Sequence, residues 1–347
     1  PEIDLGSGFG GISVVSFDST TWDTPQTVSV SVQDNLGFQG AVRTGVVSVG
    51  VVTTDPDYGA VTPGGIAVTI LDDEKYLEIY VTDDNNVEYF EDMLGLNWTS
   101  YIGGAGGAAL FSNLGGIFVD AGTIYVADTG TLFVSAFDDM LGTNHIESAA
   151  LVSPDGVGVY SGSVYASNNS ATQPIITEAA LSLVTTATLD VGAVFGNAHT
   201  TRVYVDASGI YVGDNFVAPA KVHRFDDMSG AVYDTYDGAG GTLFADVADI
   251  ARDSLGRIYV VDAGTTLVYR FADMTGTGHV EYNGSLGDPA FDTPFNTPSG
   301  IAIDSLDRIY VTDDGNNLLY RFDDMTGAGQ VEFDGGGTPF AGIDDVY

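Results

Sequence analysis

The chain has 347 residues, with 48 Asp or Glu against 10 Lys or Arg, so its formal net charge is −38. A polyanion of this kind repels nucleic acid and anionic membranes. No apolar run reaches the roughly 18 residues of a membrane span, so we expect neither nucleic-acid binding nor membrane insertion. The sequence has no Cys, which excludes disulfides and Cys nucleophiles, and its 46 Gly with frequent Thr, Val and Tyr favour an all-β fold.

Residues 1–74 predict a small module of short strands. Residues 17–30 read as a turn that enters an alternating strand, and residues 66–74 as a last apolar strand that ends in acids. The Trp-Asp-Thr-Pro-Gln-Thr-Val string at 22–28, with the terminal acids, resembles the second half of the Calx-β-like and Ig-like sandwich modules of bacterial surface proteins. We therefore expect a partial β-sandwich that packs on the rest of the chain or is completed by another chain.

The acids of this module are the first-choice metal ligands. Calx-β-like modules gather calcium at loops of this type, with carboxylates from their last strand, so the resemblance implies a Ca²⁺ site here. Hard oxygen ligands in a flexible cluster suit Ca²⁺ better than Mg²⁺. The candidate ligands are Asp34, Asp72, Asp73 and Glu74.

From residue 75 to residue 347 the sequence repeats. A tyrosine in a short apolar strand recurs at intervals of 45, 40, 46, 48 and 51 residues, at Tyr80, Tyr125, Tyr165, Tyr211, Tyr259 and Tyr310. Periods of roughly 40–50 residues with several short strands indicate propeller blades. Six anchors therefore indicate six blades.

Each blade follows one order of elements. An apolar strand precedes the tyrosine strand, and a third strand, a turn with the pattern Phe-x-Asp-Met and an outer strand follow it. This turn occurs at residues 90–93, 137–140, 225–228, 271–274 and 322–325. The third blade lacks it, so we expect that blade to diverge.

The last blades carry a family pattern. Residues 298–304 read Pro-Ser-Gly-Ile-Ala-Ile-Asp and residues 310–317 read Tyr-Val-Thr-Asp-Asp-Gly-Asn-Asn. Together they resemble NHL-type repeats, and the continuation at 320–327 resembles bacterial secreted NHL-like proteins. The resemblance covers residues 75–347 and is most specific in blades four to six. It implies a six-bladed β-propeller of a secreted or cell-surface protein, and it does not imply an activity.

The C-terminal residues are predicted to close the ring. The strand of Tyr80 lacks the apolar strand that precedes it in other blades, and residues 340–345, Phe-Ala-Gly-Ile-Asp-Asp, supply one. A blade completed by strands from both ends of the propeller sequence leaves no open sheet edge.

Five Asp residues and one Asn end the tyrosine strands. Asp side chains commonly cap the amides of their own turns, and we favour that role. The other possibility is that several converge on a cation, as in six-bladed lactonase-like propellers. These second-choice Ca²⁺ ligands are Asp83, Asp128, Asp214, Asp262 and Asp313, with Asn168 in blade three.

Two histidines suggest acid–base chemistry at first sight. His145 and His279, however, occupy a repeat position that elsewhere holds Trp98, Tyr233 or Gln330. A position that accepts all four residue types is a packing or surface position, so we expect no catalytic role there.

We expect a secreted bacterial structural or adhesive protein without enzymatic activity, which self-assembles into an extracellular polymer or matrix stabilised by calcium. Its expected partners are copies of itself and surface glycans. Two alternatives stay open: a propeller enzyme of the lactonase or lyase type, and a carbohydrate- or peptide-binding module. The sequence has no P-loop, dinucleotide-binding fingerprint, nucleophile elbow or His-Glu-x-x-His motif. Most acids occupy repeat positions, which argues against the enzyme.

Overall fold

A computed structural model of the chain describes residues 3–4, 31–32, 42–47, 66–71, 78–170, 175–196, 198–285 and 293–347. The chain divides into two compact units, Pro1–Tyr76 and Leu77–Tyr347. In the first unit two antiparallel strand pairs are described: β1 (Ile3–Asp4) with β2 (Ser31–Val32), and β3 (Val42–Val47) with β4 (Ile66–Leu71). The partial β-sandwich expected for this unit stays a prediction.

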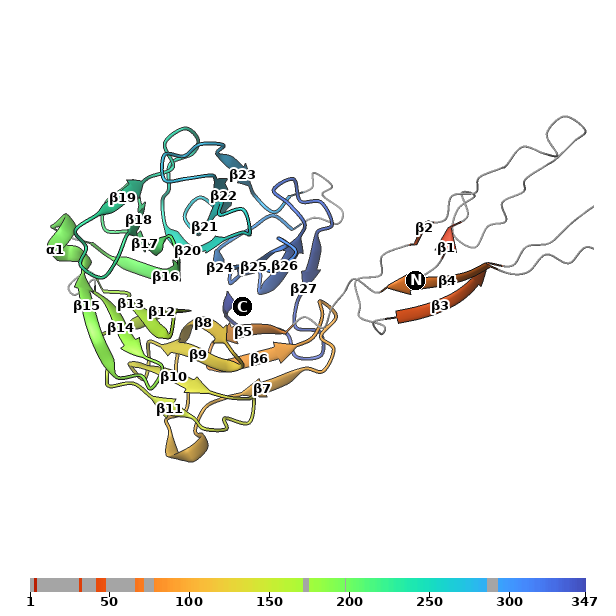
Figure 1. The fold of residues 1–347 in the computed structure, drawn as a ribbon, viewed down its shortest axis with the longest axis horizontal. Coiled ribbons are helices and arrows are strands. Elements are labelled where there is room, and N and C mark those ends of the chain that lie inside the picture. The colour runs from red at the N-terminus through yellow and green to blue at the C-terminus, as the bar shows by residue number, and fades with distance from the viewer. Residues whose placement is uncertain are drawn as a thin grey trace, which may run out of the picture. The chain divides into compact units, whose positions relative to one another are not determined.

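The second unit is an all-β propeller of six blades, as the sequence predicted. Each blade is a four-stranded antiparallel sheet, and the six sheets surround one axis (Figure 1). From axis to rim, blade one contains β28 (Ile343–Val346), β5 (Ile79–Asp83), β6 (Asn86–Phe90) and β7 (Thr99–Tyr101); blade two β8 (Leu114–Asp120), β9 (Thr123–Asp128), β10 (Phe133–Phe137) and β11 (Ile146–Glu147); blade three β12 (Pro154–Tyr160), β13 (Ser163–Asn168), β14 (Ile175–Ala180) and β15 (Thr185–Asp190).

Blades four to six have the same order. Blade four contains β16 (Thr200–Asp206), β17 (Gly209–Asp214), β18 (Lys221–Phe225) and β19 (Tyr233–Tyr236); blade five β20 (Val247–Arg252), β21 (Ile258–Asp262), β22 (Leu267–Phe271) and β23 (Val280–Tyr282); blade six β24 (Pro298–Ile303), β25 (Ile309–Asp313), β26 (Leu318–Phe322) and β27 (Val331–Phe333). All six anchor tyrosines lie on the second strand of a blade, which confirms the repeat. The described helices are the short η1 (Ala105–Gly107) and α1 (Val191–Phe195), and neither has the length or apolar character to cross a bilayer.

The ring closes through the C-terminal strand, as predicted. In blade one, β28 pairs antiparallel with β5, with Ile343 opposite Asp83 and Val346 opposite Val81. Reciprocal backbone hydrogen bonds of 2.9 and 2.8 Å between Tyr80 and Tyr347 extend the ladder. The inner strand of blade one therefore comes from the opposite end of the propeller sequence, and it pairs with the edge of β5 that would otherwise be open.

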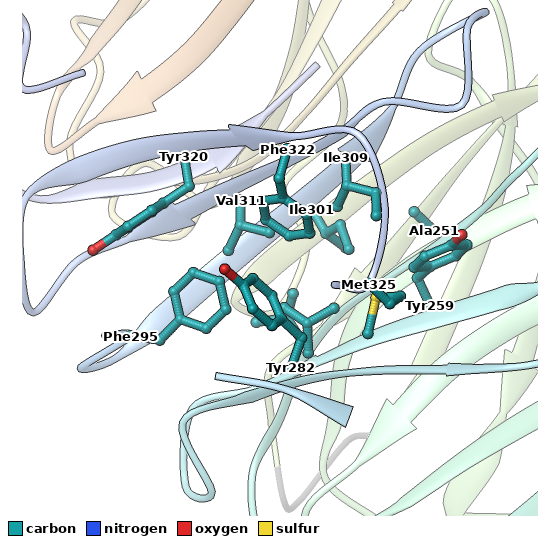
Figure 2. Packing of buried hydrophobic residues seen from close by; sticks show 12 residues of the cluster. Ala251, Tyr259, Tyr282, Phe295, Ile301, Ile309, Val311, Tyr320, Phe322 and Met325 are labelled. Atoms are coloured by element: carbon teal, nitrogen blue, oxygen red, sulfur yellow. The ribbon is translucent and has the colours of Figure 1, made fainter. Parts of the chain in front are cut away.

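The core lies between neighbouring blades. All five residues of β25 are buried, because each blade packs between two others and both faces of its central strands are covered. Figure 2 shows the cluster between blades five and six, which contains Tyr259 and Tyr282 of blade five together with Ile309 of blade six. Burying a large apolar side chain stabilises a fold by roughly 1.5–3 kcal/mol, so these clusters hold each blade against the next.

The Phe-x-Asp-Met turns lie at the rim. Their Asp side chains accept hydrogen bonds from the amides two residues on, for example Leu141 N to Asp139 Oδ1 at 2.9 Å. The same cap occurs at Asp92, Asp227, Asp273 and Asp324. These caps explain why the turn recurs with an invariant Asp in this chain.

The two repeat histidines join neighbouring blades. The Tyr101 hydroxyl of blade one lies 2.7 Å from His145 Nδ1 of blade two, and the Tyr236 hydroxyl of blade four lies 2.9 Å from His279 Nδ1 of blade five. The packing role expected for His145 and His279 agrees with these contacts. Blade three diverges as predicted, and α1 follows its last strand; Phe195 of α1 stacks on the buried His223 of blade four at a ring-centroid distance of 3.8 Å.

Candidate binding pocket on the propeller axis

A pocket of about 610 Å³ opens at one end of the propeller axis. Its walls are the first residues of five inner strands and the residues that follow the second strands of blades three to six. Its polar lining residues are Asp155, Asn169, His199, Thr201, Arg202, Asn215, Asp246, Thr297, Ser299, Asp314 and Asp344.

An irregularity in strand pairing aims these residues at the axis. In β16, Thr200 pairs with Asp214 and Val203 with Val212, so Thr201 and Arg202 lie in a β-bulge. The other five inner strands have a register shift at the equivalent place. A bulge bends its strand and redirects side chains. In ring order from blade one, the first bulge position holds Asp344, Gly115, Asp155, Thr201, Ala248 and Ser299, and the second holds Asp345, Gly116, Gly156, Arg202, Asp249 and Gly300.

Three of the six second bulge positions are glycine. The other three hold the charged side chains of Arg202, Asp249 and Asp345. A Cβ on Gly156 would lie 2.7 Å from Arg202 Cα, and one on Gly300 would collide with the Asp345 side chain. The close approach of adjacent inner strands therefore requires glycine at these places.

Arg202 is the centre of the axial cluster. Its side chain is 5% exposed, and its Nη2 and Nη1 lie 2.7 Å from Asp344 Oδ2 and Asp345 Oδ2. Asp249 neighbours Asp345 in the cluster, and the charge of Asp345 contributes to the raised pKa of Asp249. Asp345 and Asp249 each accept an amide hydrogen bond from the next blade, at 2.9 Å from Ile117 N and Ile301 N respectively. The cluster thus links blades one, two, four, five and six.

Burial shifts the proton affinities of the cluster. It raises the pKa of Asp344 to about 7, although Arg202 opposes the shift. Burial also raises the pKa values of Asp249 and Asp345. The negative charge of Asp345 adds to the shift of Asp249. For Arg202, burial alone would lower the pKa, but Asp344 and Asp345 outweigh it and the pKa is raised, so this residue is always charged.

The pocket walls add further carboxyls. Burial raises the pKa of Asp246, with a contribution from Asp262, and burial together with Asp313 raises that of Asp314. Thr201 is 6% exposed, and its Oγ1 has no hydrogen-bond partner. With four Asp in the lining and its one Arg already paired with two carboxylates, the pocket carries an excess of negative charge.

The strand-ending acids predicted as second-choice ligands remain in separate blades. Asp128, Asp262 and Asp313 each accept amide hydrogen bonds both from their own turn and from the loop that leads into the inner strand. Asp83 accepts one from Ala341 at 2.9 Å. Asp214 caps His199 and Phe216; burial opposes its ionisation, but hydrogen bonds from His223 and these amides leave its pKa lowered.

No metal-binding arrangement is found in the part of the chain that the structure describes, where no three His, Asp or Glu side chains are grouped to hold an ion. The first-choice ligands Asp34, Asp72, Asp73 and Glu74 lie outside the described residues. The Ca²⁺ site at those positions stays a prediction.

Sequence reasoning missed the axial residues. Most acids do occupy repeat positions, but Arg202, Asp249 and Asp345 break the repeat at one inner-strand position. Aligned on the apolar inner strands, Gly116, Gly156 and Gly300 correspond to Arg202, Asp249 and Asp345. A position that holds glycine in three blades and a charged residue in the other three is the signal in the sequence. An alignment on the tyrosine strands does not reveal it.

Comparison with known proteins supports the fold. The NHL repeat pattern matches residues 295–322. A chain of the nidogen/laminin complex is similar at 15% identity with a TM-score of 0.57, covering 78% of this chain and 97% of that one. Virginiamycin B lyase from Staphylococcus aureus is similar at 14% identity with a TM-score of 0.45, covering 63% of this chain and 69% of the other. No curated protein matches the sequence.

Proposed function

We propose that the chain is a non-catalytic binding protein of the bacterial cell exterior, and that its propeller binds a positively charged organic group in the axial pocket. The observation that carries this proposal is the charge of the pocket: Asp155, Asp246, Asp314 and Asp344 line it, whereas Arg202 is already paired with Asp344 and Asp345. A concave site lined by one sign of charge attracts a ligand of the opposite sign.

The lining of the pocket favours an organic cation over a sugar or a metal ion as the ligand. The described lining contains no Phe, Tyr or Trp ring on which the apolar face of a sugar could stack. The described carboxyls are not grouped as a metal site. An ammonium or guanidinium group, with several N–H donors, can instead be shared among separated carboxylate and amide oxygens.

The raised pKa values of Asp246, Asp314 and Asp344 support the same proposal. These acids hold protons more strongly than usual because burial disfavours their charged forms, and neighbouring carboxylates add to the effect. A bound cation would lower their pKa values and release protons. The affinity for the cation should therefore increase as the pH rises from 5 to 8.

The structural or adhesive role, with self-assembly and calcium, remains part of the proposal. Most propeller cations are used within the chain: Arg224, Arg252, Arg257 and Arg308 each lie within ion-pair distance of a carboxylate of their own unit, as Arg202 does. Few cationic side chains of the described propeller residues therefore remain to pair with the acids of a second copy. Polymerisation through propellers would thus depend on bridging Ca²⁺. The propeller of the nidogen/laminin complex indicates that this fold is compatible with protein binding.

One observation favours an enzyme as the second candidate. A carboxyl with a pKa of about 7, such as Asp344, is suited to general acid–base catalysis near neutral pH. In that case Asp344 would exchange a proton with a substrate held in the pocket, as expected of a lyase. Turnover of a lactone or ester panel that is lost in Asp344→Asn would favour this candidate over the binding module.

Calorimetric titration tests the binding proposal. The probes are n-butylguanidinium, its neutral analogue n-butylurea, and butyrate. Only the cation should bind, and the double substitution Asp155→Asn with Asp314→Asn should weaken it about tenfold, a loss typical of two charge contacts. Asp120→Asn is the matched control, because this exposed acid lies at the opposite end of an inner strand. Equal binding of all three probes, or an equal loss in the control, would overturn the proposal.

A further inference from the structure

An exposed apolar surface adjoins the acidic pocket. Phe216, Val217 and Leu243 are 42%, 59% and 49% exposed. Phe216 and Val217 directly follow Asn215, and Leu243 stands two residues before Ala245; both Asn215 and Ala245 line the pocket. We refer to Phe216, Val217 and Leu243 as the apolar ledge.

The two loops that carry the ledge are held against one another. Val247 N donates to Asn215 Oδ1 at 2.9 Å, and Ala220 N donates to the Phe244 carbonyl at 3.1 Å. Phe216 N also donates to Asp214 Oδ1 at 3.0 Å. The loops are thus fixed at both ends by hydrogen bonds between blades four and five, and the ledge keeps its place relative to the pocket wall.

Phe216 and Val217 are an exception to the repeat, whereas Leu243 has an exposed counterpart in Leu110 of the loop between blades one and two. After the strand-ending Asp, other blades continue with small or polar residues: Thr129-Gly130-Thr131 in blade two, Ala263-Gly264-Thr265 in blade five and Asp314-Gly315-Asn316 in blade six. Blade four alone among these has Asn215-Phe216-Val217. Exposed apolar residues at a place where the repeat is polar indicate a contact surface, because exposure is unfavourable without a partner.

The pocket itself provides an independent sign of a ligand. Thr201 is more than nine-tenths buried and lines the pocket, yet its hydroxyl oxygen has no hydrogen-bond partner in the structure. A buried polar group without a partner is costly. A donor from a bound molecule would satisfy it at the same time as it meets the carboxylates.

We propose that the partner is an extended peptide segment of another protein, which places a Lys or Arg side chain in the pocket and a neighbouring apolar side chain on the ledge. This inference rests on the proposed function and specifies its ligand. Charge complementarity selects the basic residue. The ledge selects the neighbour, because Asn215 in the pocket wall and Phe216 in the ledge are adjacent along the chain, so a side chain beside the basic residue lies near the ledge.

Three peptides test the proposal by fluorescence anisotropy. The first peptide contains Lys-Leu between Gly residues, the second has Lys-Gly, and the third has norleucine-Leu without charge. We expect the Lys-Leu peptide to bind about five- to tenfold more tightly than Lys-Gly, and the uncharged peptide not to bind. In the Phe216→Ser/Val217→Ser variant the Lys-Leu to Lys-Gly affinity ratio should approach one. Leu255→Ser, at a 74% exposed apolar residue on the turn between β20 and β21, should keep the ratio.

The outcomes separate this inference from the proposed function. If both lysine peptides bind equally in the parent protein, the pocket binds cations but the ledge does not select a neighbour, and the inference is overturned. If n-butylguanidinium binds and neither peptide does, the pocket serves small amines, which also overturns it. If no cation binds, the proposed function fails as well.

Discussion

Arg202 and Asp345 occupy equivalent positions on inner strands three blades apart, and Arg202 Nη1 lies 2.7 Å from Asp345 Oδ2 across the propeller axis. A ring of six blades places such positions opposite each other. The contact is possible because three of the remaining four equivalent positions are glycine. The axis is therefore closed by an ion pair rather than by apolar packing, and the pocket lies over this pair.

Removing the cation from this cluster should be severely destabilising. Arg202→Met leaves the buried Asp345 and Asp249 and the partly buried Asp344 without a counter-charge, and we expect a loss of about 3–5 kcal/mol in the free energy of unfolding by urea. Arg224→Met is the control, since Arg224 pairs with the exposed Asp226 and Asp234 and should cost about 0–1 kcal/mol. Equal losses in the two variants would contradict a special role for the axial pair.

Deleting residues 338–347 should open the ring. The deletion removes the buried side chains of Phe340, Ile343 and Val346, a loss of about 5–9 kcal/mol on apolar area alone. Urea unfolding should lose cooperativity. A synthetic peptide of residues 338–347 should restore it, whereas a scrambled peptide should not. A truncated protein that unfolds like the full chain would rule out closure by this strand.

The axial acids should make the protein more stable in mild acid than at neutral pH. The folded-state pKa of Asp344 is raised to about 7 from the usual 3.8. Between these values the folded state binds more protons than the unfolded state, so stability falls as the pH rises and the loss is complete above pH 7. Asp344→Asn should remove about 2 kcal/mol of this dependence after allowance for its exposure. Identical slopes for parent and variant between pH 5 and 7.5 would refute the assignment.

The blade-joining histidine His145 should act in the opposite direction. Burial lowers its pKa, so in the folded state it resists protonation, and its contribution to stability is lost as the pH falls below the unfolded value of about 6.5. His145→Gln is a conservative test, because Gln330 makes the equivalent contact to Tyr282 between blades five and six. The variant should match the parent at pH 8 and lose less stability at pH 5. A variant that is equally acid-sensitive would contradict this role.

Calcium should raise the melting temperature through the N-terminal unit. Ligand binding to the folded state stabilises by mass action, and the expected ligands are Asp34, Asp72, Asp73 and Glu74. Melting curves with EGTA and with excess Ca²⁺ should differ in the parent and coincide in Asp72→Asn/Asp73→Asn. The double variant Asp262→Asn/Asp313→Asn should retain the difference. The absence of both a shift and bound metal by elemental analysis would exclude the site.

The sequence predicted the propeller because its signals are periodic. Tyr80 and its five counterparts recur once per blade, and the missing inner strand of blade one pointed directly to residues 340–345. The axial site is not periodic in the same way. Arg202 lies in an apolar strand and resembles any surface arginine until strand pairing shows that Asp345, 143 positions away, is its neighbour. Contacts across the axis depend on how the ring closes. A local sequence pattern does not predict which distant residues that closure brings together.

Asp345 reaches Thr82 across 263 residues of sequence, and this separation sets an order of events during synthesis. Translation at about 5–20 residues per second leaves roughly 13–50 seconds between the appearance of β5 and that of β28. For the last 142 residues of that interval Arg202 has been made while Asp344 has not, so the nascent propeller carries the axial cation before its partner carboxylates exist. Closure is therefore tied to completion of the whole repeat array, because a ring of five blades and three strands of the sixth leaves Arg202 without Asp344 and Asp345.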